Sequence, residues 1–307
     1  MSDMWSLFLS PSFGYAIFRV TTPILFAALG NVISSRAGVS NIAMEGTMLM
    51  SALAGVLVSA FFKSALVGFL GALITGVLFS ALMACLNLYL GTSIIMGGIA
   101  LNLFASKFSV FLLYLSSGQK GNSAALASKQ LPLVVIPGLN RVPVLGEILS
   151  GQNVLVYCGW IAIIATYLLL AKTRLGKHIK AVGENPVAAA SVAINVRRVK
   201  FIALCLSGLM AGFGGAYMSM GYLSMFTRNM VAGRGWIAIA ASAMGQSRVI
   251  PTVLTSFLFG IFNAIGNILQ LKNLPSELVT ALPSVAVFIG LIMYSSSLSR
   301  KKGKLAN

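Results

Sequence analysis

Charged side chains are scarce in this sequence. They make up 9% of its 307 residues, whereas hydrophobic side chains make up 58%, and the mean hydropathy is +0.92. A water-soluble domain covers its outside with charged residues at roughly a quarter of its positions. The shortage excludes a soluble globular protein and predicts an integral membrane protein.

Residues that carry out catalysis are also few. The sequence has five acidic residues, one histidine (His178) and three cysteines. Cys85, Cys158 and Cys205 all lie in apolar stretches without short-range pairing, which gives neither a disulfide framework nor a metal site. The apolar stretches hold no paired carboxylates, H-E-x-x-H or Ser/Lys constellation, which disfavours an intramembrane enzyme.

Long apolar runs dominate what is present. A helix crosses about 30 Å of hydrocarbon at about 1.5 Å per residue. Runs of that length lie near 12–31, 40–62, 65–90, 92–115, 153–171, 199–222, 249–271 and 278–298. A shorter run near 231–246 either crosses or turns back within the membrane. We expect an all-α polytopic transmembrane helix bundle of 8–10 spans, forming a single domain over residues 1–307.

The positions of the cations predict the orientation of the bundle. Eleven of the 22 Lys and Arg residues lie in 172–200 and 300–304. Cytoplasmic loops are enriched in Lys and Arg, so we expect both stretches, and therefore the C-terminus, in the cytoplasm. If 231–246 were re-entrant, the stretches 172–200 and 300–304 would lie on opposite sides of the membrane. Because the charge rule places both in the cytoplasm, it favours a full crossing at 231–246 and nine crossings in all.

The polar stretches outside the runs form no separate soluble domain. The net charge of +17 therefore indicates contact with anionic membrane lipid and no nucleic-acid partner. The longest polar interval, 116–152, has turn-forming glycines and prolines and only three cations. We expect it to be an external loop.

The segment 172–198 is too polar to span and is rich in Ala and Val. Asn185 can cap a short helix, P-V-A-A-A-S-V-A, with Pro186 in its first turn. The small side chains make this helix flat enough to lie in a groove of another protein. An ordinary amphipathic helix at the membrane interface is the alternative.

Several motifs occur in order along the chain, beginning with T-R-L-G-x-x-I-x-A-V-G-E-N-P at 173–186. The others are S-x-x-G-V-x-N-I-x-M-E-G-x-M-L-M (35–50), G-I-A-L-N-L (98–103), V-P-V-L-G-E-I-L-S-G-Q-N (142–153), S-G-L-x-A-G-x-G-G-A-Y (207–217) and A-G-R-G-W-I-A-I-A-A (232–241). In these the chain resembles the permease subunits of bacterial ABC importers of the ribose and branched-chain amino acid type. It is most similar to the nucleoside (simple-sugar) permeases that work with basic-membrane-protein lipoproteins.

The resemblance implies a transport subunit of an ATP-driven importer in a bacterial plasma (inner) membrane, and not an enzyme. The implied partners are ATP-binding subunits, a second permease of different sequence and an external solute-binding lipoprotein. No G-x-x-x-x-G-K-[ST] motif occurs, so we expect no cofactor on this chain and ATP and Mg on the partner. The implied solute is a nucleoside or nucleobase, with a simple sugar or a branched-chain amino acid as alternatives.

The resemblance also implies which residues couple transport to ATP hydrolysis. Five residues of the cytoplasmic segment would dock on the ATP-binding subunit: Gly183, Glu184, Asn185, Pro186 and Ala189. An ion-coupled secondary transporter is the alternative mechanism. It would need several acids or histidines inside the membrane, and only Glu45 is available there.

Two polar residues near the start of the second span are candidates for the translocation pathway. Glu45 would lie about 7 Å deep by helical rise, where an acid needs a partner. It is interpreted either as a gate residue, bonded to Asn41 or to a neighbouring helix end, or as a packing or capping acid. Asn41 is a pathway candidate with it.

Three further polar residues are pathway candidates. Asn102 interrupts an apolar helix and either bonds between helices or lines the path. Lys107 stands where similar permeases have an apolar or small residue. It either lines a wet cavity or extends its side chain to the outer surface. Arg234, in A-G-R-G-W, counts among the outer cations. The turn S-A-M-G-Q-S-R-V-I-P (242–251) departs from such permeases, which usually have Gly, Lys and Trp before an Asn-Pro.

Overall fold

A computed structural model describes residues 10–135 and 145–270 of the chain. The described elements are α2 (Pro11–Arg36), α3 (Met44–Phe62), α4 (Ala65–Leu88), α5 (Ile94–Ser117), β1 (Leu133–Val134), α6 (Leu145–Leu149), β2 (Gln152–Asn153), α7 (Val154–Lys172), α8 (Arg174–Glu184), α9 (Pro186–Ser191), α10 (Val196–Tyr217), the π-helical turn η2 (Met218–Tyr222), α11 (Arg234–Met244) and α12 (Val249–Gln270). Seven helices within these ranges are long and apolar enough to cross a membrane. The all-α polytopic bundle is therefore confirmed, while the predicted run 278–298 and the tail 300–304 lie outside the described residues.

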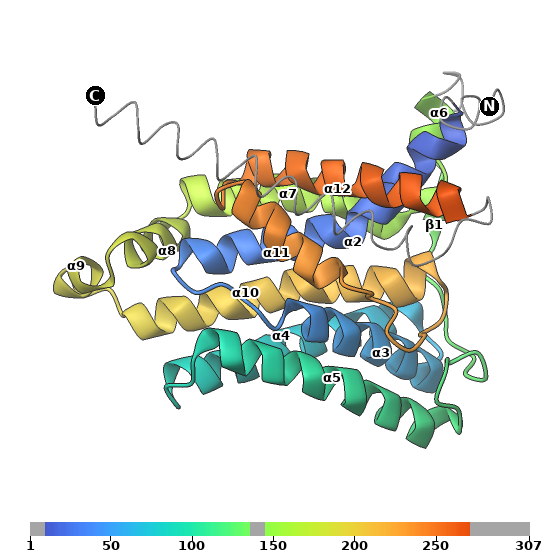
Figure 1. The fold of residues 1–307 in the computed structure, drawn as a ribbon, viewed down its shortest axis with the longest axis horizontal. Helices are drawn as coiled ribbons and strands as arrows, with labels where there is room; N and C mark the ends of the chain where they lie inside the picture. Colours follow the sequence, from blue (N-terminus) through green and yellow to red (C-terminus); the bar gives the residue numbers. More distant parts are fainter. Residues whose placement is uncertain (1–9, 136–144, 271–307) are drawn as a thin grey trace.

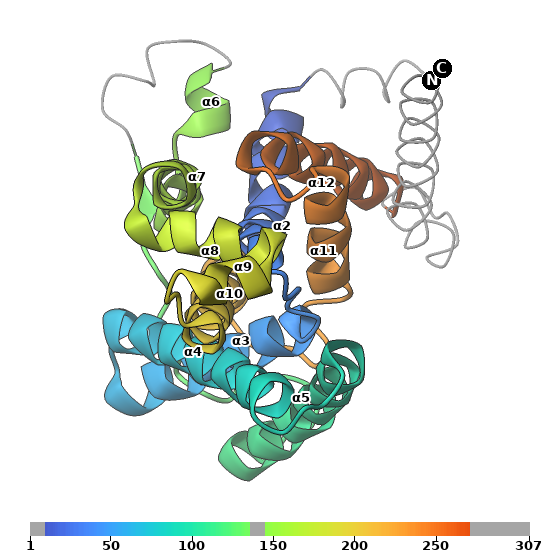
Figure 2. The same cartoon turned by 90° about the vertical axis from the view of Figure 1, so that its left-hand side faces the viewer.

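The long helices lie side by side, with α2 and α10 in the middle (Figure 1). Seen from one end, α4 and α5 lie on one side of this pair and α11 and α12 on the other (Figure 2). Glycines allow the central helices to approach closely. A Cβ atom on Gly208 would collide with the Gly76 carbonyl of α4, and one on Gly215 with the Met48 carbonyl of α3. We name the two ends of the bundle after the elements that lie there, the α9 end and the α6 end.

Two crossings are only partly helical. After α2 the chain turns back into the bundle as a non-helical segment over 37–43, so α3 begins at Met44. After η2 a second non-helical segment over 223–233 precedes α11, whose 11 residues cover about 16 Å. Hydropathy detects such segments as apolar runs and cannot distinguish extended backbone from helix.

The run near 231–246 belongs to a full crossing. Tyr222 accepts a hydrogen bond from Arg19 at the α6 end of α2. Ser247 accepts one from Arg36 at the α9 end of the same helix. Those two arginines are separated by about 25 Å of helical rise, so the chain crosses the bundle between Tyr222 and Ser247. The crossing is confirmed, although only its second half is helical.

The predicted loop 116–152 is described up to residue 135 and again from 145. Its middle and its end meet where β1 and β2 pair antiparallel, with Leu133 opposite Asn153. Ser123 makes two hydrogen bonds to Phe226 of the 223–233 segment. Its hydroxyl oxygen accepts from the Phe226 N–H, and its own N–H donates to the Phe226 carbonyl. The loop thereby fixes the segment that leads into α11.

Candidate functional site

Glu45 joins the two partly helical crossings. It lies in the first turn of α3, and its Oε1 accepts a hydrogen bond from the Gly233 N–H at 2.8 Å. Its Oε2 accepts one from the Gly235 N–H at 2.7 Å. The first N–H groups of a helix have no acceptor within the helix, and a carboxylate also complements the helix dipole there. The expected bond to a neighbouring helix end is present, and it fits both interpretations of Glu45, the gate residue and the capping acid.

The close approach depends on glycine. A Cβ atom on Gly235 would lie 2.6 Å from the Cα and the N of Glu45. Gly233 has φ of +81°, a left-handed conformation that glycine adopts at no steric cost. The motif A-G-R-G therefore supplies the two donors and the space for the carboxylate.

Asn102 of α5 holds the start of α3 from the other side. Its Nδ2 donates to the Ile42 carbonyl at 2.9 Å, and its Oδ1 accepts from the Gly46 N–H at 2.7 Å. Asn102 lies eight residues from the first residue of α5, or about 12 Å along the helix. Glu45 therefore lies about 12 Å inward from the start of α5, deeper than the predicted 7 Å, because the 37–43 segment carries the chain inward before α3 begins.

Arg234 lies inside the bundle and not among the outer cations. It is the first residue of α11, between the two glycines that donate to Glu45. Its Nη1 donates to the carbonyls of Met230 and Val231, at 3.3 and 3.1 Å. Its Nε is buried without a hydrogen-bond partner among the described residues.

Asn41 belongs to a separate cluster and does not bind Glu45. Its Nδ2 donates to the hydroxyls of Ser80 on α4 and Ser207 on α10, at 3.0 and 3.2 Å. Its backbone N–H donates to Asn31 Oδ1 at 3.2 Å, and Asn31 Nδ2 donates to Ser242 on α11. Asn31 thus links the 37–43 segment to α11. Sequence analysis missed it, although an asparagine in the apolar first span was a detectable signal.

Lys107 stays apart from both clusters. Its side chain is exposed on the outward face of α5, together with Phe104 and Phe111. It makes no hydrogen bond to any described residue. The face that carries it is the surface of this chain and not its interior.

A polar cavity of about 250 Å³ at the α6 end was not predicted as a site. Tyr15, Arg19, Gln152, Asn153 and Tyr217 are among its lining residues. The Arg19 guanidinium lies 4.5 Å from the centre of the Tyr222 ring and donates to the Tyr222 carbonyl at 2.6 Å. The Arg19 guanidinium therefore holds η2 against α2.

The segment 172–198 folds as two short helices at the α9 end (Figure 1). Thr173 caps α8 by accepting from the Gly176 N–H at 3.0 Å. Asn185 caps α9 by accepting from the Val187 and Ala188 N–H groups, both at 3.0 Å. Pro186 is the first residue of α9. The predicted cap and first turn are confirmed.

The five residues expected to dock on a partner divide into two groups. Glu184, Asn185 and Pro186 are exposed at the turn between α8 and α9. Gly183 is packed so closely that a Cβ atom would collide with the Arg36 carbonyl, and Ala189 is only 3% exposed. The second pair therefore fixes the helices on the bundle, and the first three residues face outward.

The sequence is similar to those of known membrane transport proteins. Residues 15–296 match the family model described as "Branched-chain amino acid transport system / permease component". The chain is 34% identical to the nucleoside ABC transporter permease protein NupC of Lactococcus lactis, over 89% of each chain. It is 31% identical to the guanosine ABC transporter permease protein NupQ of Bacillus subtilis, over 88% of this chain and 87% of that one.

Among solved structures, PsaBC from Streptococcus pneumoniae in complex with Fab has a similar fold. The TM-score is 0.52 at 16% identity, over 90% of this chain and 88% of that one. The family match covers nearly the whole chain, including both partly helical crossings and the α8–α9 segment. The chain therefore belongs to the branched-chain amino acid transport system permease family.

Proposed function

We propose that this chain is a membrane-spanning subunit of an ATP-driven importer of nucleosides or nucleobases. The solute is inferred from the relatives named for nucleoside and guanosine transport. The energy source is inferred from the α8–α9 turn, whose exposed residues extend beyond the long helices at the most cationic part of the described chain. That turn is the observation that carries the proposal.

The proposal includes orientation and partners. The α9 end and the C-terminus face the cytoplasm of a bacterium, where an ATP-binding subunit with ATP and Mg²⁺ contacts the turn through Glu184, Asn185 and Pro186. The α6 end receives solute from an external binding lipoprotein. A second permease of different sequence covers the exposed face of α5.

The packing suggests how movement of α9 reaches the middle of the membrane. Gly183 lies against the Arg36 carbonyl at the end of α2, directly before the 37–43 segment. Arg36 Nε donates to the Ser247 carbonyl at 2.6 Å, in the turn that follows α11. A displacement of α8 therefore acts on both segments that meet at Glu45. We propose that opening and closing of the pathway changes this contact.

The pathway candidates then have different roles. The amide groups of Asn41 and Asn102 bind their own chain, so these residues position the crossings. Glu45 and Arg234 belong to the moving junction. Lys107 faces the second permease across the pathway and is the one of the five whose charged group is free to meet solute.

Uptake by vesicles that contain this chain, the second permease and the ATP-binding subunit, with the solute-binding lipoprotein supplied outside, tests the proposal. We expect uptake of radiolabelled guanosine that requires ATP, is unaffected by an ionophore, and is reduced by unlabelled nucleosides but not by ribose or leucine. Uptake abolished by the ionophore would indicate an ion-coupled transporter. Competition by ribose alone or by leucine alone would indicate that the solute is a sugar or a branched-chain amino acid, and not a nucleoside.

A further inference from the structure

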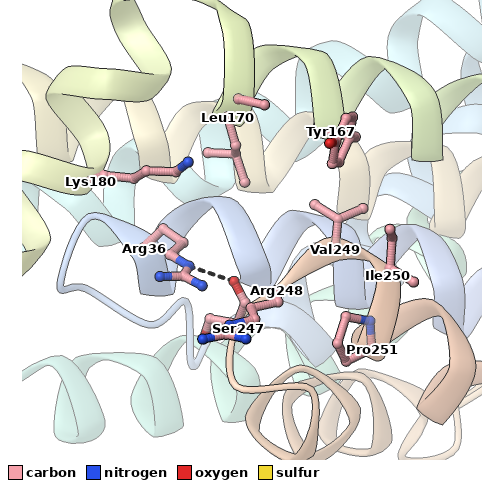
Figure 3. A pocket seen from close by; sticks show the side chains of 10 residues that line it. Arg36, Tyr167, Leu170, Lys180, Ser247, Arg248, Val249, Ile250 and Pro251 are labelled. Atoms are coloured by element: carbon pink, nitrogen blue, oxygen red, sulfur yellow. Dashed lines mark hydrogen bonds between the residues drawn. The ribbon is translucent and has the colours of Figure 1, made fainter.

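A second pocket lies at the α9 end, away from the Glu45 junction. It has a volume of about 480 Å³ and opens between the ends of α2 and α7, α8 and the start of α12 (Figure 3). Three cationic side chains line it: Arg36, Lys180 and Arg248. Within residues 10–135 and 145–270, no acidic residue lines it. An uncompensated group of three positive charges favours an anion.

The cations have unused hydrogen-bond donors. Arg36 donates from Nε to the Ser247 carbonyl at 2.6 Å and from Nη2 to the Gln246 carbonyl at 3.5 Å, which leaves further N–H groups free. The Lys180 ammonium and the Arg248 guanidinium donate to no residue in the described part of the chain. The turn at residues 246–247, both with φ near +50°, holds Arg36 in place.

The rest of the pocket is apolar. Tyr167 and Leu170 of α7 face Val249, Ile250 and Pro251 of α12 (Figure 3). The apolar wall continues along the outer surface of both helices, since Ile164 is 60% and Leu254 is 66% exposed. These side chains lie along membrane-spanning helices, so the pocket is open toward the lipid.

We propose that this pocket binds an anionic phospholipid. The phosphodiester lies against Arg36, Lys180 and Arg248, and the acyl chains follow the groove between α7 and α12. Basic pockets between transmembrane helices at the cytoplasmic side are suited to acidic headgroups. A free phosphate ion would leave the apolar wall uncovered, and an acidic protein segment would not match it. The turn at 242–251 supplies Arg248 and half of this wall.

The test uses the purified full-length chain in an uncharged detergent and needs no transport assay. Phosphatidylglycerol, phosphatidylcholine and inorganic phosphate are added separately, and thermal unfolding and lipid retention in native mass spectrometry are measured. We expect phosphatidylglycerol alone to raise the Tm and to remain bound. An effect of inorganic phosphate equal to that of phosphatidylglycerol, or no effect of either, would overturn the proposal.

Two charge-matched variants locate the site. In K180Q/R248Q neither replaced side chain donates a hydrogen bond to a described residue, so we expect normal folding. We expect phosphatidylglycerol binding to be at least tenfold weaker. K177Q/R198Q removes two exposed cations from the same end that do not line the pocket, and we expect wild-type binding. Equal loss in both variants would mean general attraction to surface charge. If K180Q/R248Q does not fold, the single variants are measured against Lys177→Gln with the same expectation.

Discussion

Glu45 and Gly235 are 190 positions apart in the sequence and are joined by a 2.7 Å hydrogen bond inside the helix bundle. A carboxylate at this depth is costly unless it is satisfied. The N-terminus of α11 satisfies it with two N–H groups, and the carboxylate in turn satisfies the otherwise unpaired donors of that helix. The two partly helical crossings therefore depend on each other.

Replacing Glu45 by glutamine should weaken this junction. The amide keeps one acceptor but directs its NH₂ group at a backbone N–H, so one of the two hydrogen bonds is lost and a buried donor is left unpaired. We expect destabilisation of roughly 1–3 kcal/mol and slower uptake. Thermal unfolding and vesicle uptake measure the two effects. Glu147→Gln, on α6, is the control and should change neither.

The space at Gly235 should be equally sensitive. Gly235→Ala places a Cβ atom 2.6 Å from the Glu45 backbone, where no flexible side chain can move away. We expect α11 to shift, with a loss of roughly 1–3 kcal/mol of stability. Gly121→Ala is the matched control, because nothing lies within 4 Å of its Cβ position. Equal stability of the two variants would contradict the tight contact.

Lys107 provides a test of the exposed α5 face. It lies ten residues from the end of α5 at Ser117, about 15 Å along the helix, so its side chain is too short to reach the outer surface easily. We expect Lys107→Met to reduce the apparent affinity for nucleoside at matched expression. Phe111→Met, on the same face, is the control. Unchanged uptake by Lys107→Met would remove this residue from the pathway.

The orientation can be measured by cysteine labelling. Ala124 at the α6 end and Val187 at the α9 end are exposed, whereas the nearby Ser123 and Ala189 are buried and unsuitable. In a chain with its three cysteines replaced by alanine, Ala124→Cys should react with an impermeant maleimide in intact cells. Val187→Cys should react only after the membrane is opened. The reverse result would invert the proposed topology.

Features that depend on neighbouring residues were predictable from the sequence. Asn185 and Pro186 begin α9 as expected, because a helix cap is a contact within one turn.

Features that depend on long-range pairing were not predictable. Apolar runs gave no sign that 37–43 and 223–233 are non-helical, so Glu45 was expected nearer the surface and Arg234 outside the bundle. The partners of Glu45 lie 188 and 190 positions away, and no spacing rule reaches that far. The three cations of the pocket at the α9 end are likewise brought together only by the packing of α2, α8 and the turn that precedes α12.

The central claim is that ATP hydrolysis by a partner acts on this chain through the α8–α9 turn. Glu184→Trp adds bulk at an exposed position, so the chain should fold and insert normally. Ile161→Trp is the control, since Ile161 is 64% exposed on α7, away from both the α8–α9 turn and the exposed face of α5.

The decisive measurement is nucleoside uptake per ATP hydrolysed in vesicles containing the complete transporter. For Glu184→Trp we expect a fall of at least tenfold with wild-type amounts of permease in the membrane, and for Ile161→Trp we expect the wild-type ratio. A wild-type ratio for Glu184→Trp would contradict the proposed coupling.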